Sequence, residues 1–360
     1  MRKGTLLLLL WGLLGGIFSA AAQRGDDDAL PEEFWLGADI SATTMLEHQG
    51  IFSYNAQGVR TENTLLMQQL GMNAIRLRVW VDPRGGWSSK EDLLAMALRA
   101  QRLGMPILVC FHYSDWWADP GKQYPPAAWA DLSYEPLCLA LAQHTRETLT
   151  LLRDHGIDVR WVQVGNETSN GFLWPVGHRD RMEQYAGLTE AGYQAVKAVF
   201  PDAQVIVHLD NGFDHELYRS IFDALHDFGT HWDMIGMSIY PYWAIQAGRE
   251  PDAEATLCHS LENISLLAER YQCPVMIVET GVEAQKPDEG YDFLSRLIDG
   301  ALRLPGAPCK GVFYWAPESC HGGYPLGAFI DDRPSRIMDA FSEAAQRLQK
   351  NHAARLCEGE

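Results

Sequence analysis

The sequence lacks several patterns that identify metal-binding, nucleic-acid-binding and membrane proteins. Its seven cysteines form no CxxC pair and no Cys/His spacing typical of zinc, so we expect no metal site of that kind. Positive charge is also scarce. The 360 residues carry a formal net charge of −18 and no basic stripe, which argues against nucleic acid or anionic lipid as a partner. A neutral ligand is compatible with this charge.

Long apolar runs are missing beyond the first residues. Residues 1–22 combine a basic start, an apolar run over 6–17 and small residues at the end, which is typical of a secretory signal peptide. The run is shorter than the ~20 residues that a spanning helix needs, and no second run follows, so we expect no membrane span. We therefore expect an exported protein, periplasmic or extracellular, whose mature chain starts with a flexible segment over 23–33.

No linker rich in proline, serine or glycine divides the mature chain. The length after the leader suits one large domain with its loops, and we place this catalytic domain at 34–352, with a C-terminal tail at 353–360. We expect a monomer. The odd number of cysteines leaves at least one thiol unpaired, and we assign no disulfide.

Short apolar runs rich in valine, isoleucine and aromatic residues recur about every 39 residues, each followed by a stretch of helical periodicity. The eight runs are 34–41, 74–80, 106–113, 159–167, 204–210, 233–241, 274–281 and 310–318. One strand and one helix per interval predicts an α/β fold, a single (β/α)₈ TIM barrel. A doubly wound open sheet is the alternative, but no glycine-rich phosphate turn follows the first run, which favours the barrel.

Two glutamates end otherwise apolar runs on the fourth and seventh predicted strands. Glu167 closes Val-Gln-Val-Gly-Asn-Glu and Glu279 closes Val-Met-Ile-Val-Glu. Active sites of such barrels lie at the C-terminal strand ends, so both carboxyl groups are expected to face one pocket. Glycosidic cleavage needs such a pair, one to protonate the leaving oxygen and one to attack, or to activate water, at the anomeric carbon. Structural pairing with a buried arginine is the alternative for either glutamate alone.

Cationic and hydroxyl groups near these strand ends can divide the roles of the two glutamates. Arg76 or Arg78, together with Tyr240, can donate to Glu279 and keep it ionised, while Glu167 lies nearer apolar surface and stays protonated. We therefore expect Glu167 to act as acid/base and Glu279 as nucleophile.

Further polar and aromatic side chains at the strand ends are candidates for substrate contacts. Asn166 can hydrogen-bond a sugar 2-hydroxyl, and Trp315 is the expected floor for the sugar being cleaved. A single tryptophan is more often part of a core than of a sugar subsite. The remaining candidates for substrate contacts are Asp39, His112, Asp115 and Trp116.

Seven segments together resemble one enzyme family, the family 53 glycoside hydrolases, which are endo-β-1,4-galactanases. The strand-three segment, Phe-His-Tyr-Ser-Asp-Trp-Trp-Ala-Asp-Pro-Gly-Lys-Gln at 111–123, is the most specific, because Asn-Glu alone occurs across many barrel glycosidases. It is accompanied by Pro-Ala-Ala-Trp at 126–129, and the other matching segments are 37–41, 75–83, 162–168 with 171–175, 233–241, 277–281 and 311–315.

The resemblance implies acid/base at Glu167, nucleophile at Glu279, net retention, and the β-1,4-galactan of pectic type I arabinogalactan as substrate. Some members of the family carry a structural calcium near the last strands. Here residues 316–332 form a short segment to which no calcium ligand can be transferred, so we expect no required cofactor and leave calcium open. The alternatives are another polysaccharide endohydrolase of the clan, such as a mannanase, and a glycan-binding protein without turnover.

Overall fold

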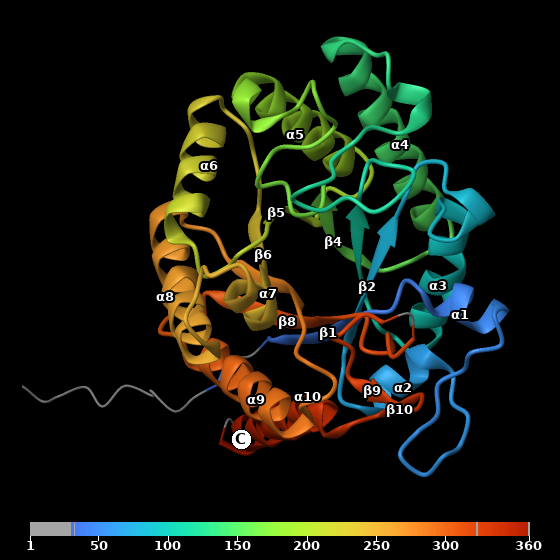
Figure 1. Cartoon of the computed structure of the whole chain (residues 1–360), viewed down its shortest axis with the longest axis vertical. Coiled ribbons are helices and arrows are strands. Elements are labelled where there is room, and N and C mark those ends of the chain that lie inside the picture. Colours follow the sequence, from blue (N-terminus) through green and yellow to red (C-terminus); the bar gives the residue numbers. More distant parts are fainter. Residues whose placement is uncertain (1–29, 32, 322, 359–360) are drawn as a thin grey trace, which may run out of the picture.

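Eight parallel strands close into a barrel in the computed structural model, which describes residues 30–358 apart from 32 and 322. The strands pair in chain order, with β8 against β1, and helices surround them (Figure 1). This confirms the predicted (β/α)₈ barrel. The barrel strands are β1 (Trp35–Asp39), β2 (Ala74–Val79), β3 (Ile107–Phe111), β4 (Val159–Val164), β5 (Gln204–Leu209), β6 (Met234–Ile239), β7 (Val275–Thr280) and β8 (Cys309–Trp315).

Helices connect successive strands, and several begin at a side chain that caps the first turn. Ser89 Oγ accepts from the backbone N–H of Asp92 at the start of α3, and Asp252 accepts from Ala255 at the start of α8. The helices are α1 (Thr43–His48), α2 (Asn63–Gln69), α3 (Lys90–Arg102), α4 (Tyr134–Asp154), α5 (Met182–Lys197), α6 (His215–Asp227), α7 (Pro241–Gln246), α8 (Ala253–Tyr271), α9 (Pro287–Arg303) and α10 (Asp339–Glu358).

The barrel interior consists of an apolar layer with a polar layer above it. Alternate strand residues face inward, so a side chain two positions further along a strand lies one layer nearer its C-terminal end. The apolar layer includes Ala74, Trp161, Ile206 and Phe313. Two positions after the first three of these stand Arg76, Gln163 and His208, all buried. The inward-facing positions nearer the C-terminal end of the barrel are therefore polar.

Both ends of the last predicted strand differ from the structure. Strand β8 begins at Cys309 and ends at Trp315, three residues before the predicted end, because Ala316 turns to a φ of 48° and Pro317 has no N–H for the ladder. The following segment forms a two-stranded antiparallel sheet of β9 (Phe329–Ile330) and β10 (Arg333–Pro334).

The ends of the chain were expected to be a leader, a flexible segment and a tail. Residues 1–29, which hold the leader and most of the flexible segment, lie outside the described residues. At the other end, α10 extends through the expected tail to Glu358, and Arg355 donates to the carbonyl of Leu30 at 2.7 Å. Within the described ranges, no helix combines the length and apolar character that crossing a bilayer requires.

Six of the seven cysteines are free thiols: Cys110, Cys138, Cys258, Cys273, Cys309 and Cys320.

Candidate active site

A cavity of about 420 Å³ opens at the C-terminal ends of the barrel strands. Glu167 and Glu279 both line it, although they come from β4 and β7 on different sides of the barrel. The other lining residues are His112, Trp117, Ala118, Asp119, Lys122, Asn166, Tyr240, Trp243, Trp315 and Tyr324.

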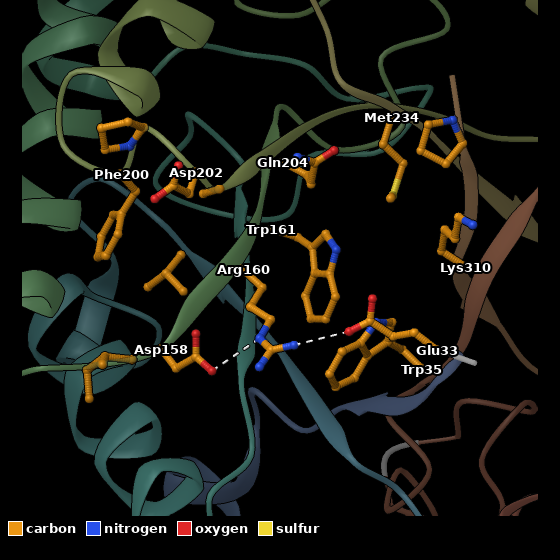
Figure 2. Close-up of a pocket in the computed structure, with 15 residues that line it drawn as sticks. Glu33, Trp35, Asp158, Arg160, Trp161, Phe200, Asp202, Gln204, Met234 and Lys310 are labelled. Carbon is orange, nitrogen blue, oxygen red and sulfur yellow. Dashed lines mark hydrogen bonds and ion pairs between the residues drawn. The ribbon is translucent and has the colours of Figure 1, made fainter. Parts of the chain in front are cut away.

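A larger cavity of about 600 Å³ lies at the opposite, N-terminal ends of the strands (Figure 2). Two of its three carboxylates, Glu33 and Asp158, form ion pairs with Arg160, at 3.3 and 3.2 Å. The Arg160 guanidinium also lies 4.7 Å from the ring centre of Trp35. In barrels of this kind the N-terminal face serves stability rather than chemistry, so the smaller cavity with its pair of glutamates is the candidate active site.

A sharp backbone turn after β4 places Glu167 at the cavity. Gly165 has a φ of 89° and Glu167 a φ of 49°, so the chain leaves the strand through left-handed conformations. A Cβ on Gly165 would lie 2.5 Å from Cγ2 of Thr168, so the turn needs glycine there. His208 anchors the turn, because its Nδ1 accepts from the N–H of Glu167 at 3.3 Å and its carbonyl accepts from Thr168 at 2.9 Å.

An irregularity in β7 turns Glu279 toward the same cavity. Met237 of β6 pairs with Ile277, but the next residue, Ser238, pairs with Glu279, so β7 contains one extra residue. Val278 packs in the apolar interior of the barrel while Glu279 lines the cavity above it. A bulge of this kind redirects a side chain that strict alternation would point elsewhere.

Glu279 is held by one arginine and one tyrosine. Arg76 Nη2 lies 2.7 Å from Oε1 of Glu279, and the hydroxyl of Tyr240 donates to Oε2 at 2.9 Å. The Arg76 side chain is fully buried and also pairs with Asp39 at 2.6 Å. Of the two arginines considered from the sequence, Arg76 therefore holds the glutamate. The guanidinium of Arg78 instead lies 4.0 Å from the ring centre of Trp117.

The two glutamates differ in the neighbouring groups that counteract the effect of burial on their pKa. Burial raises the pKa of both carboxyl groups. At Glu279 the positive charge of Arg76 and the hydroxyl of Tyr240 counteract that rise. At Glu167 the negative charges of Glu279 and Asp210 add to it, so its pKa rises well above the usual range. The proton of the pair therefore resides on Glu167 and the charge on Glu279.

A chain of buried hydrogen bonds links the two sides of the site. Arg76 Nε donates to Oε1 of Gln163 at 2.7 Å, so the Gln163 amide nitrogen donates to Nδ1 of His208 at 2.8 Å. The His208 proton must then be on Nε2, which donates to Oγ of Ser238 at 2.8 Å. Ser238 is also a hydrogen-bond partner of Glu167, and its hydroxyl lowers the pKa of that carboxyl. Each group in this chain therefore donates to the next, from Arg76 through Gln163 and His208 to Ser238, which contacts the acid/base candidate Glu167.

The sequence model of glycosyl hydrolase family 53 matches residues 35–293. The chain belongs to this family, and it is a glycoside hydrolase. It is 35% identical over 318 residues to an uncharacterised protein of Niallia circulans, covering 79% of this chain and 84% of the relative. It is 31% identical over 302 residues to a probable arabinogalactan endo-β-1,4-galactanase A of Aspergillus tubingensis, covering 78% and 84%.

Two solved structures have a fold similar to that of this chain. A fungal β-1,4-galactanase structure superposes with a TM-score of 0.79 at 25% identity, over 86% of this chain and 99% of that one. The family 53 catalytic domain of Ignisphaera aggregans superposes with a TM-score of 0.78 at 28% identity, over 88% and 98%. The described part of the chain therefore has the barrel of its family.

In this family 53 hydrolase, three of the polar candidates for substrate contact lie at the cavity. His112 Nδ1 accepts from the N–H of Ala118 at 3.1 Å, which puts the ring proton on Nε2. Burial and the nearby Arg78 keep the pKa of His112 well below its usual value, so the ring is a neutral donor. Asn166 accepts from Arg76 and donates to Ala118, each at 2.9 Å, which leaves one amide N–H for a ligand. The third, Tyr240, donates to the nucleophile candidate.

An aromatic wall faces the two glutamates. Trp315 lines the cavity, with its ring centre 5.6 Å from that of Trp117 and 5.0 Å from that of Tyr324. Tyr324 could not be recognised from the sequence, because it lies in the irregular segment after β8 and not at a strand end. Trp243, from α7, is 45% exposed and completes the wall at the cavity mouth.

Besides Arg76 and Arg78, the candidates Asp39, Asp115 and Trp116 do not line this cavity within the described part of the chain. Asp39 is buried and binds Ser41 and Arg76. Asp115 accepts from the backbone N–H groups of Asp82 and Ala127, at 2.9 Å each, and so joins neighbouring loops.

Trp116 is 58% exposed and stacks on Trp80 at 5.1 Å.

The buried chain of Gln163, His208 and Ser238 was also not found from the sequence. Its only signal is a polar residue at an inward position of an otherwise apolar strand.

Proposed function

We propose that this hydrolase is an endo-acting β-1,4-galactanase that cleaves type I arabinogalactan with net retention. The observation that carries the proposal is the unequal pair in one cavity: Glu279 held by Arg76 and Tyr240, and Glu167 with a raised pKa. The substrate is supported by relatives named arabinogalactan endo-β-1,4-galactanase, 31% and 33% identical to this chain.

In the first step, the carboxylate of Glu279 attacks the anomeric carbon of the galactose while Glu167 gives its proton to the leaving O4 of the next sugar. The glycosidic bond breaks, and an ester between Glu279 and the sugar forms. Loss of negative charge at Glu279 removes one cause of the raised pKa of Glu167. Glu167, now ionised, is therefore suited to act as a base in the next step.

In the second step, a water molecule replaces the leaving sugar and gives a proton to Glu167 as its oxygen attacks the anomeric carbon. The ester bond to Glu279 breaks, the configuration is retained overall, and both glutamates return to their starting protonation states. Arg76 and Tyr240 stabilise the negative charge that returns to Glu279.

The cavity suits a chain that extends beyond one sugar. It is open at the strand ends, and the exposed Trp243 and Lys122 belong to its lining. Aromatic side chains provide flat apolar surface for sugar rings. We infer internal cleavage of a polysaccharide from this opening.

Hydrolysis of linear potato galactan, compared with xylan, mannan and cellulose, tests the substrate. The proposal expects reducing ends to appear from galactan together with a rapid fall in viscosity, since internal cuts shorten the polymer early. Activity on mannan alone would instead support the mannanase alternative. Galactan binding without oligosaccharide release over days would support a glycan-binding protein. NMR of the first product tests retention, because the initial anomer is then β.

We also propose that the protein is exported and acts as a monomer. The apolar segment within residues 1–22 supports export, and the net charge of −18, which disfavours self-association, supports the monomer. N-terminal sequencing of protein recovered outside the cytoplasm would find a start near residue 23. A full-length N-terminus in the cytoplasmic fraction alone would contradict export, and a dimer mass by light scattering would contradict the monomer.

A further inference from the structure

Three potential metal ligands meet beside the active site, in the segment that follows β8. Cys320 and His321 lie on the loop between β8 and β9, and Asp332 lies in the turn between β9 and β10. His321 Nε2 is 2.5 Å from Oδ1 of Asp332, and Cys320 Sγ is 3.4 Å from the same oxygen. The sulfur, nitrogen and oxygen atoms all lie within 4.8 Å of one another.

Asp332 lies in a two-residue hairpin turn between β9 and β10. Asp331 and Asp332 both have positive φ values, 49° and 60°, which L residues adopt at a cost in free energy. The carbonyl of Asp332 also accepts from the N–H of Tyr54 at 2.9 Å, which attaches the turn to the loop before α2. The backbone of Asp332 is therefore held in place, while the loop supplies the other two donors.

The donor set is that of a transition metal and not of calcium. Zinc binds thiolate sulfur at about 2.3 Å and imidazole nitrogen or carboxylate oxygen at about 2.0–2.2 Å, which puts tetrahedral ligand atoms roughly 3.3–3.8 Å apart. The Cys320–Asp332 separation already matches this range. His321 and Asp332 would need to separate by about 1 Å, which two side-chain rotations can provide. Calcium requires six or more oxygen ligands, and a thiol and an imidazole do not fit it.

The three ligand side chains are accessible, and Asp332 has a single ion-pair partner among the described residues. The side chain of His321 is 42% exposed and that of Asp332 29%, so water can reach the ligand atoms. Within the described ranges, His321 is the ion-pair partner of Asp332, and neither lysine nor arginine pairs with it. This group of residues can thus accept a divalent ion without displacing a stronger salt bridge.

A second observation comes from an adjacent cavity of about 240 Å³, which Asp332 lines together with Glu318. Glu318 is only 4% exposed, and neither of its carboxylate oxygens has a hydrogen-bond partner among the described residues. A buried carboxyl without a partner is costly, and a cation bound at Asp332 would offset that cost by Coulomb attraction.

We propose that Cys320, His321 and Asp332 bind one divalent transition metal of the zinc type, with an open fourth position. This departs from the expectation drawn from cysteine spacing, because Asp332 reaches the other two through the fold. The site joins the β8–β9 loop to the turn after β9. Tyr324 lies on that loop and lines the active cavity against Trp315. Metal binding therefore fixes one wall of the cavity.

Metal titration of the full mature enzyme after treatment with a chelator tests the site. Cobalt(II) is the spectroscopic probe, because a thiolate ligand gives it a charge-transfer band. The wild type is expected to bind zinc and cobalt one to one and to show this band. Cys320→Ser should lose the band, and His321→Ala should weaken zinc binding at least tenfold. Cys258→Ser is the matched control, since Cys258 is an exposed thiol 3.6 Å from a glutamate elsewhere, and it should keep both properties.

Three results would overturn the proposal. They are a cobalt band that survives Cys320→Ser, zinc binding that His321→Ala leaves unchanged, and tighter binding of calcium than of zinc. The exposed position of His321 makes its alanine variant a safe second test if Cys320→Ser folds poorly, and circular dichroism would check both. Because the binding assay contains no sugar, its outcome is independent of whether galactan is the substrate.

Discussion

Removal of the Ser238 hydroxyl should shift the alkaline limb of the activity profile. Oγ of Ser238 accepts a hydrogen bond from Nε2–H of His208 at 2.8 Å. The Ser238 hydroxyl also hydrogen-bonds to Glu167 and lowers the pKa of that carboxyl group. A hydrogen bond to a charged group contributes about 1.5–3 kcal/mol. At roughly 1.4 kcal/mol per pKa unit, Ser238→Ala should raise the pKa of Glu167 by about 1–2 units.

The sign follows from the role of Glu167 as acid. The enzyme is active while Glu167 keeps its proton, so activity falls as the pH rises through its pKa. A higher pKa moves that fall to higher pH. The same change leaves the Nε2–H of His208 without a partner in the core, which should cost about 1–3 kcal/mol of folding stability.

The assay is kcat/KM on soluble galactan oligosaccharides across pH, combined with thermal unfolding. Ser260→Ala is the matched control, because Ser260 is fully buried in α8 and its hydroxyl has no hydrogen-bond partner among the described residues. It should leave the profile unchanged and cost little stability. If Ser238→Ala lowers stability but leaves the alkaline limb in place or moves it to lower pH, the donor order from Arg76 to Glu167 is wrong.

Three further predictions concern the roles and placement of the glutamates. Glu167→Gln should reduce activity on galactan by orders of magnitude yet spare substrates with good leaving groups, whereas Glu279→Gln should abolish both; equal losses on the two substrates for Glu167→Gln would contradict its role as acid. Tyr240→Phe removes a hydrogen bond that lowers the pKa of Glu279, so the acidic limb of kcat/KM should move to higher pH by about 1 unit; an unmoved limb would refute that role. Gly165→Ala should lower stability by about 1–3 kcal/mol and lower kcat, measured by chemical unfolding and steady-state kinetics, because its Cβ would meet Thr168 at 2.5 Å. Gly104→Ala, also at positive φ but with nothing within 4 Å, should lose less stability and keep kcat.

Local chemistry explains why the barrel could be predicted from the sequence. Each buried parallel strand is a short apolar run, and several helices, such as α3 and α8, begin at a capping side chain, so local sequence signals determine the order of the elements. The C-terminal ends of the strands lie together at one rim of a barrel, which is why the sequence alone places Glu167 and Glu279 at one cavity. The ends of β4 and β8 were each predicted three residues too late, because Gly165 and Ala316 end these strands through their backbone conformation, which the apolar pattern does not reveal.

The partners of those glutamates depend on the fold. Arg76 and Arg78 alternate on one strand and look equivalent in sequence, but barrel closure directs Arg76 to Glu279 and leaves Arg78 against Trp117. The extra residue in β7 that redirects Glu279 is visible only in its pairing with β6.

The same is true of contacts between distant segments. Ser238 of β6 contacts His208 of the neighbouring strand β5. Asp332, in the turn between β9 and β10, contacts Cys320 in the loop before β9. The sequence by itself determined which strands exist and which end in acids, because apolar periodicity and capping act over a few residues. Only the tertiary structure decided which cation, hydroxyl or thiol each acid meets, because those contacts require the barrel to close.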